Sequence, residues 1–124
     1  IQIVPNNVVS WHAGTSVLAG RSDCNEWCIG IEICNNGVGE VYTNAQYESV
    51  AQTVAYNTAL YHIPDLHVSS HARVALPAGR KNDPKGWDWH RMWVRVDTLR
   101  ASWPFDIQEW HDNGAVVDPR VITT

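Results

Sequence analysis

The chain has 124 residues, a length that fits one domain, and 44% of them are hydrophobic, which suffices to bury a core. The formal net charge of −4 at pH 7 argues against a nucleic-acid partner, because such proteins present basic faces to phosphates. No apolar run approaches the roughly 18 residues that span a bilayer, so we expect no membrane partner either. The chain starts at Ile1 without a signal peptide, and we expect this N-terminus to result from truncation or processing.

Short apolar runs occupy the first third of the chain. Residues 1–4 are predicted to end a strand that a proline stops, and residues 8–11 form a second run. Residues 15–26 are polar and contain glycine, which predicts a loop. Residues 28–34 then alternate strictly, which predicts a strand with isoleucines on one face and Glu32 on the other.

The clearest helix is predicted over residues 43–62. Thr43 and Gln46 match a capping box, in which each side chain accepts a hydrogen bond from the backbone N–H of the other residue. Apolar side chains then recur at helical spacing, and the dipeptide Ile63-Pro64 ends the segment. A helix of this length can cover one face of a sheet.

The second half alternates strand, loop and helix. Leu66–Ser70 is predicted as a short strand, and residues 72–87 as a loop punctuated by proline and glycine. Asp88 is a candidate cap for a last helix, because large apolar side chains repeat at helical spacing behind it. The pattern fades after Arg100, so residues 101–124 are expected to form an extension or linker.

These elements predict an α/β fold with a single mixed central sheet flanked by helices, in a domain that covers residues 1–100. Three cysteines cluster in one segment, and an odd count leaves at least one of them unpaired. Their spacing lacks the paired two-residue intervals of a structural zinc site, so we expect reduced thiols at Cys24, Cys28 and Cys34.

His71 and Asp83 are candidate metal ligands. A histidine that follows a strand is usually an ordinary surface or core residue, but Asp83 lies in a loop able to double back toward it. Imidazole nitrogen and carboxylate oxygen both bind zinc, and a catalytic zinc usually has three protein ligands and one open position. Two ligands alone are therefore a weak indication of a metal site.

Lys81 and Glu32 are candidates for catalytic roles. Lys81 stands two positions before Asp83, so in an extended loop the two side chains point the same way. Lys81 and a metal held by Asp83 would then face one substrate carbonyl, while Arg80 would point away and pair within the fold. The alternative for Lys81 is an ordinary solvated charge. Glu32 is either a solvent-facing carboxylate or a general base among less polar neighbours, and the residues alone favour neither interpretation.

A set of motifs occurs in one order along residues 1–97. They are WHAG at 11–14, Asn25, IGIE at 29–32, TNAQY at 43–47, YHIP at 61–64, SH at 70–71 and GRKNDP at 79–84. In this set and order the chain resembles the zinc-dependent type 2 N-acetylmuramoyl-L-alanine amidases and the peptidoglycan recognition proteins that share their fold. The resemblance is specific because several independent motifs agree.

The resemblance implies zinc-dependent hydrolysis of the amide bond between N-acetylmuramic acid and L-alanine in bacterial peptidoglycan. It assigns His71 and Asp83 to the zinc ion. It also implies that Glu32 is the catalytic carboxylate and that Lys81 stabilises the transition state.

The chain departs from the family pattern in one respect. The family's first zinc ligand sits on an opening strand followed by a helix, and neither matches a segment of this sequence. We therefore expect this strand and helix to be missing, the fragment alone to be inactive, and the N-terminal segment to be a candidate partner as a separate chain. Trp11 and His12 resemble one wall of the substrate groove.

The same fold would also serve a non-catalytic module that binds peptidoglycan or muropeptides, and such modules commonly lose a metal ligand. The presence of His71, Lys81 and Asp83 favours the enzyme, because a module that only binds has no need of all three. The resemblance further implies action at the bacterial cell wall, by a secreted enzyme or by an endolysin that a phage holin releases from the host cytoplasm.

Overall fold

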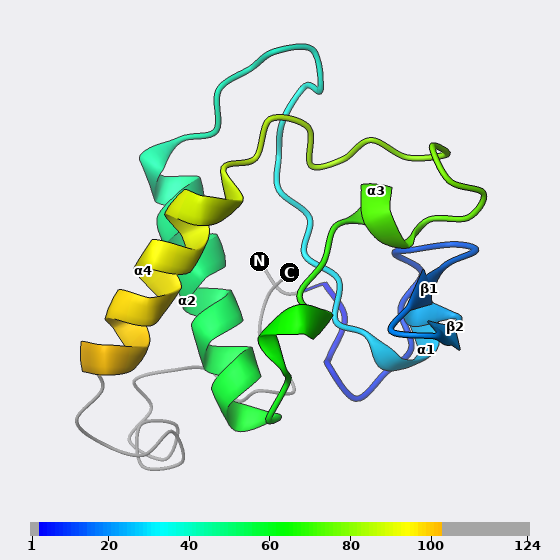
Figure 1. Ribbon diagram of the computed structural model, residues 1–124, viewed down its shortest axis with the longest axis horizontal. Coiled ribbons are helices and arrows are strands. Elements are labelled where there is room, and N and C mark those ends of the chain that lie inside the picture. The colour runs from blue at the N-terminus through cyan, green and yellow to red at the C-terminus, as the bar shows by residue number, and fades with distance from the viewer. Residues whose placement is uncertain (1–2, 103–124) are drawn as a thin grey trace.

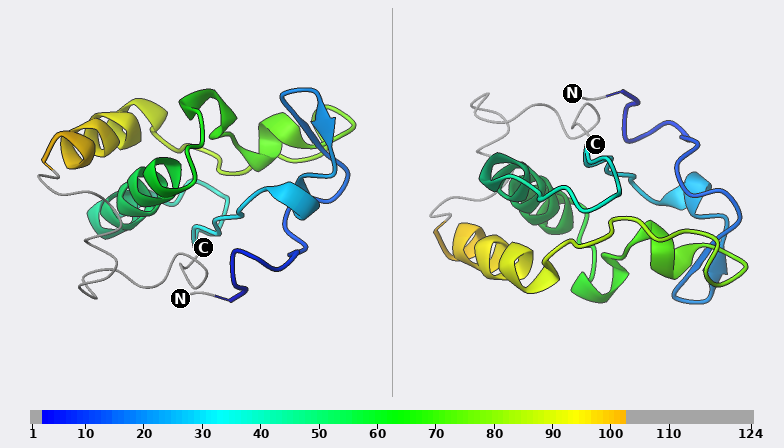
Figure 2. Two further views of the ribbon diagram at one scale, coloured as in Figure 1. Left: turned by 90° about the horizontal axis from the view of Figure 1, so that it is seen from below. Right: turned by 90° about the horizontal axis from the view of Figure 1, so that it is seen from above.

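Two groups of elements make up the structure, a computed structural model that describes residues 3–102. Helices α2 (Asn44–Leu60) and α4 (Trp89–Ser102) pack side by side on one side of the molecule (Figure 1). The other side holds four short elements, which are β1 (Val17–Leu18), β2 (Arg21–Ser22), α1 (Cys24–Trp27) and α3 (His71–Val74). A 3₁₀ turn, η1 (Asp65–His67), lies between α2 and α3 in the chain. Both views of Figure 2 show the same separation.

Both predicted helices are confirmed, together with their N-terminal caps. Thr43 Oγ1 accepts a hydrogen bond from the Gln46 N–H at 3.1 Å, and Gln46 Oε1 accepts one from the Thr43 N–H at 2.9 Å. This reciprocal pair is the capping box that the sequence predicts for α2. At α4, Asp88 Oδ1 accepts from the Arg91 N–H at 3.0 Å, as expected for a cap.

The main hydrophobic core lies between α2 and α4 and is closed by aromatic residues that precede each helix. Trp87 stacks on Tyr47, with ring centroids 4.2 Å apart, and Tyr42 meets Trp87 edge-on at 5.0 Å. The two helices run in the same direction, because Arg91, Arg95 and Arg100 of α4 bond successively later residues of α2, which are Asn44, Glu48 and Thr58.

The ion pair between Glu48 and Arg95 predicts a pH dependence of stability. Hydrogen bonds from Arg95, and a further one from Gln52, hold the pKa of Glu48 at about 2, below its usual value of 4.5. A lowered carboxyl pKa stabilises the folded state fully above pH 4.5, and this contribution is lost as the pH falls toward 2.

Glu48→Gln is therefore expected to flatten the fall in unfolding free energy between about pH 4.5 and pH 2. Urea titrations across this pH range measure the slope. Glu26→Gln serves as the control, because the exposed Glu26 side chain forms no ion pair within residues 3–102. An unchanged slope in Glu48→Gln would contradict the assignment.

The predicted single mixed central sheet is not confirmed. The sheet that the structure describes is the two-stranded antiparallel pair β1–β2, in which Val17 lies opposite Ser22. Residues 28–34, predicted as a strand, are not in one, and residues 29–33 form no backbone hydrogen bond within the part of the chain that the structure describes. A strand needs a partner for its backbone groups, and alternation along one segment does not supply it.

Three local predictions are wrong in detail. Residues 15–26, predicted as a loop, contain β1, β2 and α1. The strand predicted at Leu66–Ser70 does not form, because residues 66–67 belong to η1 and residues 68–70 are in no strand. The loop predicted over residues 72–87 starts with residues that belong to α3. Short local hydrogen bonds explain the last two differences. In η1 the Val68 N–H bonds the Asp65 carbonyl, and in α3 the Val74 N–H bonds the Ser70 carbonyl.

The predictions for the two ends of the chain have different outcomes. Residues 3–4 and 8–11 are not in strands. Residues 101–102 belong to α4, and the rest of the predicted extension, 103–124, lies outside the described residues. Within residues 3–102, no helix combines the length and apolar character needed to cross a bilayer.

Candidate active site

The side chains of His71 and Asp83 lie in contact. His71 opens α3, whose N-cap Ser70 accepts a hydrogen bond from the Arg73 N–H through its hydroxyl at 3.1 Å. The loop that follows doubles back, and the Asp83 carbonyl accepts from the Ala72 N–H at 2.9 Å. These bonds leave His71 Nδ1 3.1 Å from Asp83 Oδ2.

The environment of His71 suits a bound cation. Its Nε2 lies 3.1 Å from the carbonyl oxygen of Ala13, so both ring nitrogens face oxygen acceptors. A neutral imidazole has one N–H, so it can donate to only one of these two oxygen acceptors. The second acceptor needs either a second proton on the ring or a cation held between Nδ1 and the Asp83 carboxylate. The donor pair therefore fits two of the three protein ligands of a catalytic zinc. Among residues 3–102 no third His, Cys, Asp or Glu joins them.

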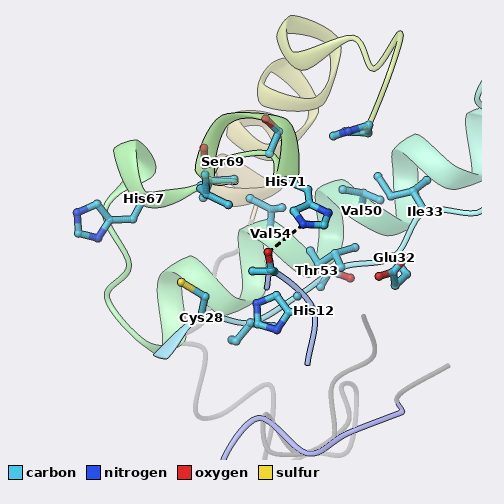
Figure 3. A pocket seen from close by; sticks show the side chains of 18 of the residues that line it. His12, Cys28, Glu32, Ile33, Val50, Thr53, Val54, His67, Ser69 and His71 are labelled. Carbon is cyan, nitrogen blue, oxygen red and sulfur yellow. Dashed lines mark hydrogen bonds between the residues drawn. The ribbon is translucent and has the colours of Figure 1, made fainter. Parts of the chain in front are cut away.

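A cavity of about 740 Å³ adjoins this pair and separates the two groups of elements. Its lining comes from α2, from the extended segment 28–33 and from residues 67–71, and includes Asp83. Figure 3 shows His71, His12 and Glu32 around this hollow, with Val50 and Val54 of α2 behind them. The cavity is large enough for several residues of chain or for a small ligand.

His12 and Trp11, predicted to line a substrate groove, lie in different environments. His12 is half-buried and lines the cavity, whereas Trp11 is 92% exposed and borders a second, smaller hollow. The His12 ring lies against Gly30 of the predicted strand, where an added Cβ would be 2.6 Å from His12 Cγ. Gly30 therefore allows segment 28–34 to approach His12.

Gly30→Ala is expected to destabilise the fold by about 1–3 kcal/mol, because the new methyl group must displace the imidazole or the backbone. Urea unfolding measures the loss. A Cβ at residue 30 would also lie 2.8 Å from His12 Cβ, so the rescue needs glycine at residue 12. In the double variant His12→Gly/Gly30→Ala these side-chain atoms are absent, so a coupling energy that restores much of the stability is expected. A Gly30→Ala variant as stable as the parent would contradict this packing.

The structure does not bring Glu32 or Lys81 into contact with the His71–Asp83 pair. Glu32 is exposed at the rim of both hollows. Lys81 is exposed and does not line either of them. Both catalytic roles stay predictions.

Two further residues hold the loop beside His71. Asn25 Oδ1 accepts from the N–H groups of His12 and Ala13, at 2.9 and 2.7 Å. Arg80 pairs within the fold, as predicted, and its partners are backbone carbonyls, one of them that of Ala13 at 2.9 Å. The motifs contain both residues, but their spacing in the sequence does not reveal that they meet at Ala13.

The cysteines are unpaired in the structure. Cys24 is buried, Cys34 is exposed, and burial, with a smaller effect from Cys24, raises the pKa of the Cys28 thiol to about 12. A raised pKa disfavours the thiolate, which is the form that binds metals.

Comparison with known proteins gives the family. A family model described as N-acetylmuramoyl-L-alanine amidase matches residues 1–86. The 1,6-anhydro-N-acetylmuramyl-L-alanine amidase AmpD of Escherichia coli is 36% identical over 98 residues, which cover 77% of this chain and 51% of AmpD. The N-acetylmuramoyl-L-alanine amidase AmiD of the same organism is 35% identical over 91 residues, which cover 67% of this chain and 32% of AmiD.

A second AmpD, from Enterobacter cloacae, is 33% identical over 99 residues, with 79% of this chain and 51% of that protein covered. The chain thus spans about half the length of the AmpD relatives that it matches. No solved structure matches it with significance. The match of the family model to most of its length shows that the chain belongs to the type 2 family of N-acetylmuramoyl-L-alanine amidases.

Proposed function

We propose that this chain carries the zinc-binding and catalytic residues of an enzyme that hydrolyses the amide bond between N-acetylmuramic acid and L-alanine. The observation that carries the proposal is the His71–Asp83 pair, whose Nδ1 and Oδ2 atoms lie 3.1 Å apart. Imidazole nitrogen and carboxylate oxygen are both zinc donors, and the pair stands beside a cavity that can admit a ligand.

We propose that the third ligand comes from outside the described residues, on a segment that precedes Ile1 or on a separate chain. Residues 29–33 border the cavity and form no backbone hydrogen bond within residues 3–102, so a strand inserted there would find hydrogen-bond partners close to His71. The chain together with this segment is called the completed protein below.

Each catalytic residue has a proposed task in the completed protein. His71 and Asp83 would hold zinc, which when bound would supply Lewis-acid assistance for the attack of water on the amide carbonyl. Glu32 takes a proton from the attacking water and returns it to the leaving amine nitrogen. Lys81 Nζ donates a hydrogen bond to the oxyanion, and the loss of one such donor typically costs about 10²–10³ in rate.

The substrate class follows from the family and from the names of the relatives. We propose peptidoglycan, or muropeptides derived from it, as the substrate, with Trp11 and His12 along the groove. Because several relatives are named for the 1,6-anhydro form of the sugar, that form is a candidate alongside the intact polymer. Action at the bacterial cell wall belongs to this proposal.

A non-catalytic muropeptide-binding module is the second candidate. The observation that favours it is the two-donor metal site, since no third donor joins His71 and Asp83 within residues 3–102. The enzyme is the better-supported candidate, because a binding module has no need of a histidine and an aspartate held in contact.

Mass spectrometry of the reaction products tests the proposal. The completed protein with zinc is incubated with intact peptidoglycan and, separately, with a 1,6-anhydro-N-acetylmuramyl peptide. We expect release of peptides with a free L-alanine amino terminus from at least one substrate, and loss of this activity with a chelator. The 124-residue chain alone should release little or none. Binding of muropeptide without cleavage would favour the second candidate, and robust cleavage by the 124-residue chain would show that the ligands are misassigned.

A further inference from the structure

The carbonyl oxygen of Ala13 accepts two hydrogen bonds beside the proposed metal site. One comes from His71 Nε2 at 3.1 Å and the other from Arg80 Nη2 at 2.9 Å. A carbonyl can accept but cannot donate, so the contact with Ala13 requires a proton on His71 Nε2. When the single proton of a neutral imidazole is on Nε2, Nδ1 has a lone pair for a cation held between this nitrogen and the Asp83 carboxylate.

Arg80 is placed to fix this carbonyl in space. Its Nη2 also donates to the Thr15 carbonyl at 2.9 Å, and its Nε donates to the Leu76 carbonyl at 2.8 Å. The guanidinium thus joins the loop after His12 to the loop after α3. It lies over Gly14, whose Cβ, if present, would be 3.2 Å from Nη2. Ala13 is only 3% exposed, and its N–H donates a hydrogen bond to Asn25 Oδ1. Hydrogen bonds therefore hold the peptide units on both sides of Ala13.

We propose that Arg80 is a positioning residue for the metal site, which acts by holding the Ala13 carbonyl against His71 Nε2 and so presents Nδ1 to the metal. This inference rests on the proposed function for the identity of the metal, but not for the orientation of the ring. Metal-binding histidines commonly donate their second ring N–H to a carbonyl, and loss of such a partner typically costs about 10–100-fold in metal affinity.

The sign of the effect separates positioning from simple electrostatics. If Arg80 acted only through its charge, its removal would strengthen cation binding, because a positive charge near the site repels the cation. If Arg80 positions the histidine, its removal weakens cation binding. Arg73 provides the matched control, because it lies two residues from His71 and its side chain makes no hydrogen bond or ion pair within residues 3–102.

The experiment compares Arg80→Gln, Arg80→Lys and Arg73→Gln in the 124-residue chain and in the completed protein. Titration with zinc alone gives the metal affinity. Long-range ¹H–¹⁵N NMR of the zinc-free protein, at a pH where the imidazole is neutral, gives the tautomer of His71. We expect about 10–100-fold weaker zinc binding and a smaller fraction of the Nε2–H tautomer in Arg80→Gln than in the parent. Arg80→Lys should change both in the same direction but less, because an ammonium cannot donate to three carbonyls in a plane.

Arg73→Gln should keep the tautomer and bind zinc as tightly as the parent or slightly more tightly. Circular dichroism checks that each variant folds. If Arg80→Gln does not fold, the zinc affinity and the His71 tautomer of Arg80→Lys are compared with those of the parent to test the role of Arg80. A parental tautomer and parental or tighter zinc binding in the folded Arg80 variants would overturn the proposal. If the completed protein without substitutions binds no zinc, the proposed function fails. The His71 tautomer in the zinc-free parent and variants still tests the role of Arg80.

Discussion

His71→Ala is expected to remove zinc from the completed protein and to abolish amide hydrolysis. The substitution deletes the imidazole whose Nδ1 lies 3.1 Å from Asp83 Oδ2 and leaves the carboxylate without its partner. Loss of a residue that merely supports a metal ligand costs about 10–100-fold in affinity, so loss of the ligand itself should cost more than about 100-fold. Zinc titration followed by atomic absorption, together with the mass-spectrometric assay, measures both effects.

His90→Ala is the matched control for this loss. His90 is exposed in the first turn of α4, and its side chain makes no hydrogen bond or ion pair in the described part of the chain. We expect parental zinc content and activity from it. If His71→Ala retained stoichiometric zinc of parental affinity, His71 would not be a ligand, and its contact with Asp83 would be an ordinary hydrogen bond.

Glu32→Gln is expected to lower the rate of hydrolysis by at least about 10²-fold, the lower range for general acid–base catalysis. Glutamine keeps the shape of the side chain but cannot accept the proton. Zinc content should not change, because the structure does not group Glu32 with His71 and Asp83. Muropeptide binding should also persist, so the effect should fall on kcat more than on KM.

The control for this variant is Glu26→Gln, which removes one exposed carboxylate from α1 and should leave the rate unchanged. Near-parental hydrolysis by Glu32→Gln would contradict the assigned role and leave Glu32 as an ordinary solvent-facing carboxylate. If the parent and Glu32→Gln both bound muropeptide equally well and neither hydrolysed it, the non-catalytic module would be favoured.

Features set by neighbouring residues in the chain could be predicted from the sequence. The capping box of Thr43 and Gln46 and the cap at Asp88 each depend on residues three positions apart, and both form as expected. The approach of Asp83 to His71 could be anticipated because both lie in recognisable motifs and the intervening loop contains glycine and proline.

Features that depend on distant partners could not be predicted in the same way. Residues 28–34 have the alternation of a strand, yet pairing depends on a second segment that alternation does not identify. The hairpin β1–β2 has two residues in each strand, too few to show a period. In the site, the meeting of Arg80 with Ala13 spans 67 residues, and the contact of His12 with Gly30 depends on packing alone.

The most direct test of the central claim is the position of zinc in crystals of the completed protein, located by anomalous diffraction at the zinc absorption edge. The account predicts one strong peak between His71 and Asp83, about 2.0–2.2 Å from an imidazole nitrogen and a carboxylate oxygen. It also predicts a third protein ligand from outside residues 3–102. A peak coordinated by other residues, or no peak at this pair in protein that hydrolyses the substrate, would contradict it.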